Sequence, residues 1–513
     1  MKDQDIVGEA LAKVLPQYGK PWYRVPHLLK LNLILLVPLL SSAVAGYDGS
    51  MMNGLQSTDS WKKFFNNPTG TRLGVVNAAQ SIGSVAVLPV VGMVNDKIGR
   101  KWTLFIGIVT IIIASIIQAA SINYGMLVAS RIIVGAGGML VSQPSPMLIG
   151  ELSFPTHRGK FTSLFWTCYY FGAILASWST YGTQKHIGSS DWAWRAPSIL
   201  QAAYPFIQLC FFWFVPESPR WLIANGKIAE AREILARYHT GGDSNHMLVE
   251  FEMAEISSAI EAERQAAATK WSSLVSTPGN RKRTFIVVCL GAFAQWNGVA
   301  VVSYYLTLVL DTVGIKDADT QTLINGLLQI FNFWAAVSAA FLVDRLGRRT
   351  LFTWSGIGML ISFVIWTACS AVFDMSANKG AGVAVVVFIF IYFFHYDIAY
   401  TPLLFGYSTE ILPYSLRAKG LTAEMLSIYG SLVVLAFVNP IALDNIGWHY
   451  YIVFCCILVA INVITWFFFP ETKGHSLEEI AEIFDGPQSR PMVDSIMLGK
   501  DDENQTVEHV QKV

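Results

Sequence analysis

Two short stretches of the chain are near copies of one another: Asp96-Lys97-Ile98-Gly99-Arg100-Lys101 and Asp344-Arg345-Leu346-Gly347-Arg348-Arg349. Each copy is followed by the same two signals, first a Glu-x6-Arg element and then a Pro-Glu pair with a hydroxyl residue behind it. In the first set these are Glu151 to Arg158 and Pro216-Glu217-Ser218-Pro219-Arg220, and in the second Glu410 to Arg417 and Pro470-Glu471-Thr472-Lys473-Gly474. Three signals repeated in one order predict two structurally related halves.

Long apolar blocks lie between these signals. The 513-residue chain is 53% hydrophobic and only 14% charged, which is too little charge to cover a soluble protein of this size. Residues 102–130 and 285–310 contain no acidic or basic side chain. A bilayer core requires about 20 apolar residues per helix, and each segment must satisfy its own backbone there, so the blocks should be helices. The expected spans are 28–54, 72–94, 102–122, 124–150, 160–181, 194–215, 284–312, 320–343, 350–373, 381–411, 418–440 and 448–469.

The repeat and the blocks together predict an all-α membrane protein, with twelve transmembrane helices in two pseudo-symmetric halves of six. The longest polar stretch separates the halves, and residues 228–238 and 248–264 within it have the apolar spacing of short surface helices. The expected divisions are an N-terminal segment at 1–27, an N-terminal half at 28–216, a linker at 217–283, a C-terminal half at 284–470 and a tail at 471–513. Halves of this kind are typical of transporters that bind solute between them.

Charge sets the expected orientation. Basic residues gather in the N-terminal segment, in the linker and in the loops after the second, fourth, eighth and tenth spans. Because Lys and Arg favour the cytoplasmic side, both termini and the linker are expected there. A formal net charge of zero argues against a nucleic-acid partner. The six cysteines lie in apolar blocks without metal-ligand spacing, so neither a metal nor a cofactor is expected.

The charged loop motifs predict ion-pair networks that tie helix ends together. Such networks would stabilise one conformation and separate in the other, and would thereby gate transport. The alternative is that these loops are basic only because they are cytoplasmic. The candidate gating residues are Asp96, Arg100, Glu151, Arg158, Glu217, Arg220, Asp344, Arg348, Glu410, Arg417 and Glu471.

These motifs resemble those of the sugar porter family of the major facilitator superfamily, over about residues 28–480. Within that family, Trp192-Ala193-Trp194-Arg195 and residues 408–417 are most similar to fungal lactose permease-like and hexose transporters. The resemblance implies the major facilitator fold and a secondary active transporter that imports a disaccharide or a monosaccharide. It also implies a monomer in the plasma membrane, with the sugar, a proton and the lipid bilayer as its partners.

Two charged residues fall inside expected spans, Asp48 in the first and Arg131 in the fourth. Charges in a bilayer core are costly, so these residues are candidates for function. The resemblance implies that they form the proton-coupling pair of a symporter, in which protonation of Asp48 weakens its tie to Arg131. A structural ion pair in a facilitator is the alternative.

The resemblance also implies a sugar site, mainly in the seventh span. Amides donate and accept hydrogen bonds, so they suit sugar hydroxyls of either sense, and aromatic faces cover the C–H face of a ring. Ala294, Ala300 and Trp166 replace the polar residues usual in the family, which points to a larger or less polar ligand such as a disaccharide. The implied substrate-binding residues are Gln295, Asn297, Asn332, Trp166, Tyr304, Tyr305, Phe405 and Asp397.

Other functions remain open at this point. The protein could be a facilitative uniporter, a sugar sensor that does not transport, or a transporter of a polyol or a cyclic polyhydroxy acid. A short tail argues against a sensor. An enzyme is not expected, because the chain offers no nucleophile–base pair, no metal cluster and no phosphate-binding loop after a strand.

Overall fold

The computed structural model describes residues 9–16, 18–267, 270–473 and 477–485. Throughout these ranges the regular structure is helical. The first half contains α3 (Pro26–Ser57), α4 (Asp59–Phe64), α5 (Gly70–Ile98), α6 (Arg100–Ala119), α7 (Tyr124–Ser142), α8 (Pro144–Leu152), α9 (Arg158–Thr167), α10 (Tyr169–Ile187), α11 (Trp192–Leu200) and α12 (Ala203–Phe211). The second contains α16 (Pro278–Trp296), α17 (Val299–Thr312), α18 (Ala318–Leu346), α19 (Arg348–Ser376), α20 (Lys379–Ile411), α21 (Tyr414–Ile446) and α22 (Tyr450–Phe468).

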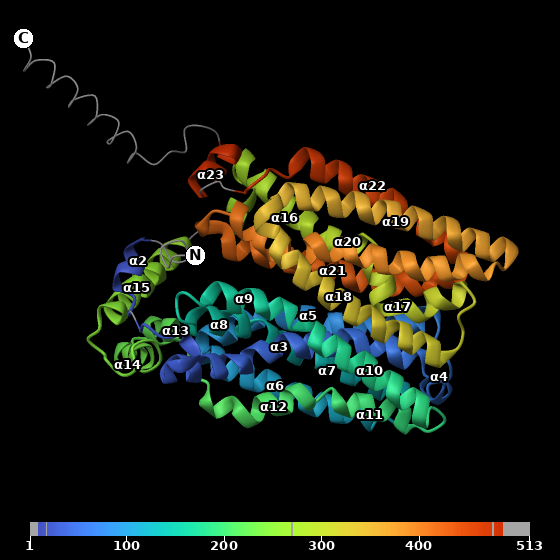
Figure 1. Ribbon diagram of the computed structural model, residues 1–513, viewed down its shortest axis with the longest axis horizontal. Coiled ribbons are helices and arrows are strands. Elements are labelled where there is room, and N and C mark those ends of the chain that lie inside the picture. The colour runs from blue at the N-terminus through green and yellow to red at the C-terminus, as the bar shows by residue number, and fades with distance from the viewer. Residues whose placement is uncertain (1–8, 17, 268–269, 474–476, 486–513) are drawn as a thin grey trace, which may run out of the picture.

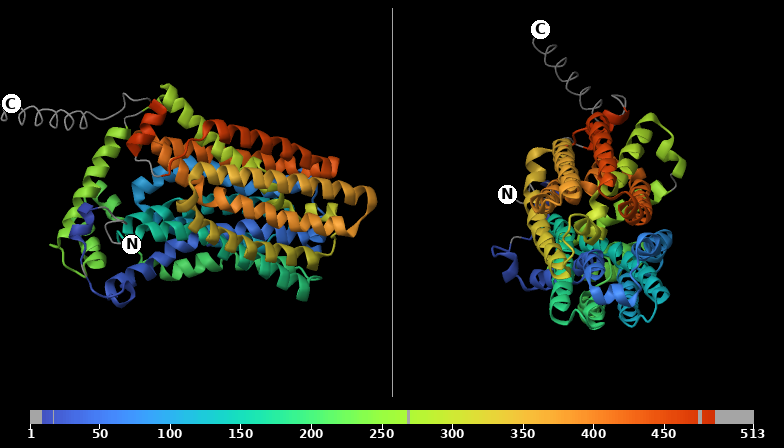
Figure 2. Two further views of the ribbon diagram at one scale, coloured as in Figure 1. Left: turned by 45° about the horizontal axis from the view of Figure 1, so that its top comes forward. Right: turned by 90° about the vertical axis from the view of Figure 1, so that its right-hand side faces the viewer.

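The two halves lie side by side along their length, as Figures 1 and 2 show. The two expected linker helices are present as α14 (Ile228–His239) and α15 (Met247–Ala267), and a further short helix, α13 (Pro219–Ala224), precedes them. They lie at the same end of the bundle as α2 (Glu9–Val14) and α23 (Leu477–Asp485), and α4 lies at the opposite end. We call the end of the bundle where α6 and α19 begin the motif end, and the opposite end the far end.

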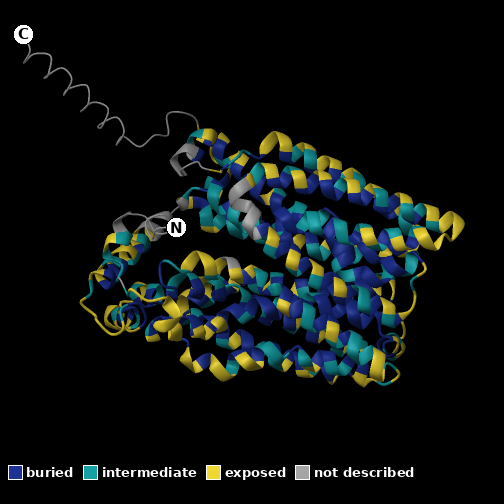
Figure 3. Ribbon diagram, in the orientation of Figure 1, coloured by how far each residue is buried: buried dark blue, intermediate teal, exposed yellow. Residues whose placement is uncertain are grey.

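Nine helical stretches in the described part of the chain are long and apolar enough to cross a membrane. One of them, 415–468, contains both α21 and α22. The expected fifth and sixth spans are each divided into two helices, α9 with α10 and α11 with α12, and neither span is among the nine. Large apolar side chains such as Ile116, Phe206 and Phe467 are 57%, 59% and 74% exposed, as expected of a surface that faces lipid (Figure 3).

The seventh span, expected as one helix over 284–312, is divided at Gly298. This residue has φ 106°, and a Cβ there would lie 2.5 Å from the Phe363 ring, so only glycine fits. The neighbouring Asn297 side chain accepts a hydrogen bond from the Val299 N–H at 2.9 Å, where α17 begins. The break directs α17 against α3 of the other half.

Helices α3 and α10 pack closely against one another at the centre of the first half. A Cβ on Gly172 would lie 1.8 Å from the Ala43 carbonyl oxygen, and a Cβ on Gly46 would lie 1.8 Å from that of Tyr169. These reciprocal glycines allow the two backbones to approach closely, as small residues do in membrane bundles. The close approach brings Asp48 of α3 and Tyr169 of α10 to the same level of the bundle.

Candidate functional site: a cavity between the halves

A cavity of about 260 Å³ lies between the two halves. It is lined by residues of α3, α9 and α10 from the first half and of α16, α17, α18, α20 and α21 from the second. Five of the sequence-predicted substrate residues lie on its wall: Gln295, Asn332, Trp166, Tyr304 and Phe405. Four of the five belong to the second half, and Trp166 belongs to the first.

The polar part of the wall is formed by amides from two helices. Gln295 comes from α16, and Gln329 and Asn332 come from neighbouring turns of α18. The Asn332 side chain is only 2% exposed, and its Oδ1 has no hydrogen-bond partner among the described residues. A buried acceptor without a partner is costly, so a ligand hydroxyl that donates to Oδ1 would be favoured.

The rest of the wall is aromatic. Trp166 of α9 stacks on Phe405 of α20, with ring centroids 5.2 Å apart and planes 23° apart, and this contact joins the two halves. The sequence interpretation missed several wall residues: Tyr169, Tyr170, Ser303, Gln329, Tyr396, Tyr400 and Thr401. Most of them lie within about one helical turn of a predicted wall residue: Tyr169 and Tyr170 of Trp166, Thr401 of Phe405, Ser303 of Tyr304 and Gln329 of Asn332. That spacing is a weak signal, because aromatic residues in membrane helices more often serve packing.

Three sequence-predicted substrate residues lie behind the wall. Asn297 is fully buried and accepts a hydrogen bond from the Tyr392 hydroxyl at 3.0 Å. Tyr305 is also fully buried and donates to the Ala436 carbonyl at 2.5 Å, joining α17 to α21. Asp397 is covered by Tyr170 and Thr401, which themselves line the cavity.

The expected pair of Asp48 and Arg131 is formed. Nη1 of Arg131 donates to Oδ1 of Asp48, and the two side chains are 1% and 3% exposed. Gln80 of α5 accepts from Nη2 of Arg131 at 2.7 Å, and Gln201 donates to the Asp48 Oδ1 at 2.9 Å. The next two residues of α3 line the cavity, so the pair lies directly beside it.

At the far end, α3 and α17 close the boundary between the halves. Asn53 donates to the carbonyls of Val302 and Ser303 at 3.0 and 2.6 Å, and its Oδ1 accepts from the Leu306 N–H at 3.2 Å. Gln56 donates to the Tyr304 carbonyl at 3.0 Å. The hydroxyls of Ser57 and Thr307 are 2.7 Å apart. We call this set of contacts the far seam.

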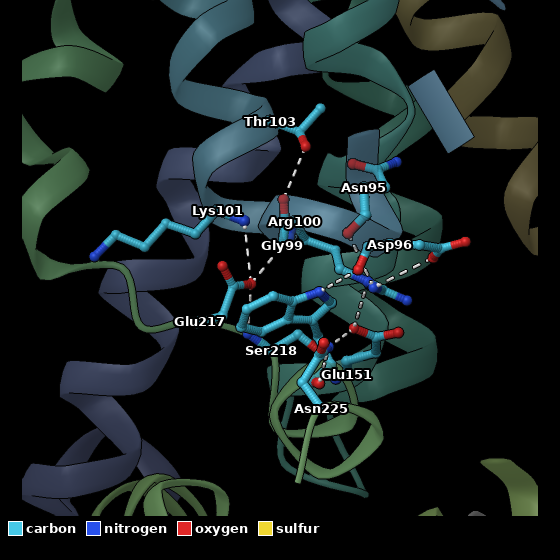
Figure 4. Close-up of polar contacts among 11 residues, drawn as sticks. Asn95, Asp96, Gly99, Arg100, Lys101, Thr103, Glu151, Glu217, Ser218 and Asn225 are labelled. Atoms are coloured by element: carbon cyan, nitrogen blue, oxygen red, sulfur yellow. Dashed lines mark hydrogen bonds and ion pairs between the residues drawn. The ribbon is translucent and has the colours of Figure 1, made fainter. Parts of the chain in front are cut away.

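At the motif end, the first set of loop motifs forms a network around the start of α6 (Figure 4). Glu217 accepts from the N–H groups of Arg100 and Lys101 at 3.0 and 3.2 Å, which caps the helix. A Cβ on Gly99 would lie 2.2 Å from this carboxylate. Arg100 lies 3.7 Å from Glu151, which also accepts from the Ser218 hydroxyl. Burial raises the pKa of Glu217 above its ordinary value, although the backbone donors act in the opposite direction.

The second set repeats this arrangement at the start of α19. Glu471 accepts from the N–H groups of Arg348 and Arg349 at 2.8 and 3.1 Å. Arg348 pairs with Glu410 at 2.9 Å, and Glu410 accepts from the Thr472 hydroxyl at 2.5 Å. Burial acts to raise the pKa of Glu471, but four backbone N–H donors outweigh it and hold the pKa below its ordinary value. The sequence repeat therefore corresponds to a repeat of contacts.

No contact described above for either network joins the two halves: the first network lies in the first half, and the second network lies in the second half. Arg100 also lies 3.7 Å from Asp96, one turn back in its own half. Arg158 and Arg220 lie around a small pocket next to Glu151 and α15, and Arg417 lies in the first turn of α21. The Asp344 side chain lies outside the described residues. The gating role of these residues remains a prediction.

The sequence and the fold of this chain are both similar to those of known membrane transporters. The chain is 29% identical to the low-affinity glucose transporter HXT1 of Saccharomyces cerevisiae, over 87% of this chain and 78% of that protein. It is 30% identical to the MFS-type transporter oryC of Aspergillus oryzae, over 86% and 82%. The inward-open structure of the xylose transporter XylE from E. coli superposes with a TM-score of 0.74 at 24% identity, over 88% of this chain and 100% of that chain.

These likenesses define the class: a multi-pass membrane transporter with the major facilitator fold, not an enzyme. The chain matches the family described as "Sugar (and other) transporter" over residues 34–484. It therefore belongs to the sugar porter family of the major facilitator superfamily.

Proposed function

We propose that the protein imports a small sugar by proton symport, through alternating access of one cavity between its two halves. The observation that carries the proposal is that a wall of amides and aromatic rings lies directly beside the buried pair of Asp48 and Arg131. The named glucose transporters among its relatives support a sugar as substrate.

The size of the cavity favours a monosaccharide over a disaccharide in this conformation. Ligand cavities usually measure about 300–1,000 Å³, and this one, at about 260 Å³, is smaller. The stack of Trp166 on Phe405 occupies the space on its motif-end side. A disaccharide would require these rings to separate, whereas a hexose or pentose would not.

The geometry of Asp48 supports a role in proton coupling. Its Oδ1 accepts from Arg131 and Gln201, while Oδ2 is buried and has no hydrogen-bond partner in the described part of the chain. In the proposed mechanism a proton binds Oδ2 and neutralises the carboxylate. The attraction to Arg131 then weakens, and α3 is released relative to α5 and α7.

The test is the Asp48→Asn variant, which mimics the protonated acid at nearly constant volume. In cells that lack their own sugar carriers, we expect it to abolish accumulation of labelled glucose or xylose against a gradient, while exchange of preloaded sugar persists. Asp191→Asn, at an exposed position before α11, is the matched control and should accumulate normally.

Wild-type uptake that is indifferent to pH and to a protonophore would overturn symport and favour a facilitative uniporter. The absence of uptake for every sugar tested, with the protein present at the cell surface, would instead favour a sensor or a transporter of a polyol or a cyclic polyhydroxy acid. We also propose a plasma-membrane location with both termini cytoplasmic, which the basic loops support.

A further inference from the structure

A second buried carboxyl group lies at the boundary between the halves. Asp397 of α20 is fully buried, and its Oδ1 accepts from the Tyr170 hydroxyl at 2.6 Å and from the Thr401 hydroxyl at 2.8 Å. Tyr170 belongs to α10 of the first half, so one of these bonds joins the halves directly. Oδ2 is buried and has no hydrogen-bond partner among the described residues.

Among the described side chains, no cation forms an ion pair or hydrogen bond with this carboxyl group. The titratable side chains that interact with it are the phenols Tyr169 and Tyr170 of α10 and Tyr392 and Tyr396 of α20. On the neighbouring α17 and α18, the cavity wall offers Tyr304 and amides in place of a basic group.

The basic residue next along the chain, His395, points elsewhere. Its Nδ1 bonds to the Ile391 carbonyl at 2.8 Å, and its ring packs on Gly358 of α19. An ionised Asp397 would therefore be stabilised by neutral hydroxyls alone, inside a membrane span, which is unfavourable compared with the neutral acid.

We propose that Asp397 is a second proton-binding site, and that its bond to Tyr170 is a latch between the halves whose strength depends on that proton. Hydrogen bonds to an ionised carboxylate are about twice as strong as those to a neutral acid. Loss of the proton therefore tightens the contact between α10 and α20, and protonation loosens it.

The position of the latch gives it a route to solvent and to the sugar. Both donors to Asp397 line the cavity, so the carboxyl group lies one side chain away from the solution in it. Nearer the motif end, Trp166 stacks on Phe405 across the same boundary. We call the stack and the latch together the near seam. The inference rests on the proposed function only in assigning a transport role to the proton.

Infrared spectroscopy of the purified protein in liposomes tests the protonation directly. At pH 7 we expect a carbonyl band of buried carboxylic acids, which Asp397→Asn should reduce. Glu424→Gln is the matched control, because Glu424 of α21 is another fully buried acid. It should remove a separate component. A band unchanged by Asp397→Asn would overturn the proton site.

Cysteine accessibility tests the latch without requiring transport. Leu404 lines the cavity beside Phe405, so Leu404→Cys should react with a water-soluble maleimide when the near seam opens. The same protein without this change corrects for its native cysteines. Because maleimides react with the thiolate, each rate is divided by that of a free thiol at the same pH. We expect this normalised rate to be about tenfold higher at pH 6 than at pH 8, and equal at both pH values once Tyr170→Phe is added.

A Tyr170→Phe variant that keeps the pH dependence of the parent would overturn the latch. Retained pH dependence in Asp397→Asn would do the same. Neither readout depends on a particular sugar or on uphill uptake. Failure of the proposed symport would therefore appear in the Asp48→Asn assay, while the infrared and accessibility results would still decide the present inference.

Discussion

The two seams that join the halves have different chemistry. The far seam joins α3 to α17 through amides and hydroxyls, and most of its bonds end on backbone carbonyls or N–H groups. The near seam joins α9 and α10 to α20 through one aromatic stack and one hydrogen bond to a carboxyl group. The far seam is thus held by several bonds, and the near seam by two contacts.

This difference suggests how the conformations are selected. The bonds of the far seam contain no group that titrates near neutral pH, so its strength should not follow the proton. The near seam contains Asp397, so the strength of the near seam should change when this carboxyl group binds or loses a proton. The far seam would then stabilise the described conformation equally at all pH values near neutral, and the near seam would make its stability depend on pH.

The largest expected effect comes from breaking the far seam with Asn53→Ala. This change removes three hydrogen bonds, two donated and one accepted by the side chain. At about 1 kcal/mol each, it should shift the balance by about 3 kcal/mol, or roughly 100-fold, toward a conformation open at the far end. The measurement is the rate at which an impermeant maleimide added from that side modifies Ser50→Cys in the cavity wall.

The control for this prediction is Asn445→Ala. Asn445 is an exposed amide near the end of α21 that donates one turn back, to the Ile441 carbonyl. It should leave the modification rate unchanged. Equal rates in Asn53→Ala and in its parent would mean that the far seam does not hold the cavity closed.

A smaller effect is expected from Trp166→Ala in the near seam. Loss of the stack on Phe405 should cost about 1 kcal/mol and enlarge the cavity on its motif-end side. Uptake of lactose relative to xylose should rise about fivefold, which competition between the two labelled sugars would measure. Trp334→Ala, at a 63% exposed position of α18, is the control. An unchanged ratio would show that the stack does not limit substrate size.

The two seams also mark what the sequence could and could not predict. The helices and the repeated networks follow from local patterns, and the structure confirms the contacts of Arg100 with Glu151 and of Arg348 with Glu410. Asp48 and Arg131 were singled out because charges are costly in membrane spans, and their pairing was implied by the family resemblance.

Trp166, Phe405 and Asp397 were expected at the sugar site, but the contacts that they make in the near seam could not be predicted in the same way. Tyr170 and Asp397 are 227 residues apart, and their contact depends on how α10 and α20 are rotated about their axes. Asn297 was expected on the wall, but the break at Gly298 turns its side chain onto the Val299 N–H. Helix rotation and helix breaks are tertiary effects that a single sequence does not encode in any short pattern.

The smallest effect on the seams is expected from the capping carboxylates of the motif networks, since their described contacts lie within one half. The raised pKa of Glu217 means that the folded chain holds this proton at a higher pH than the unfolded chain does, so its contribution to stability falls as pH rises through that range. The lowered pKa of Glu471 has the opposite sign, and its contribution is lost as pH falls.

We therefore expect Glu217→Gln and Glu471→Gln to change the dependence of the melting temperature on pH in opposite directions, by no more than about 2 °C between about pH 4 and pH 7. Thermal unfolding in detergent would measure this, and each variant is the control for the other. Modification of Leu404→Cys should keep its pH dependence in both variants. If either variant abolished that dependence, the motif networks rather than the latch at Asp397 would control the near seam, and the gating role first expected of them would be supported.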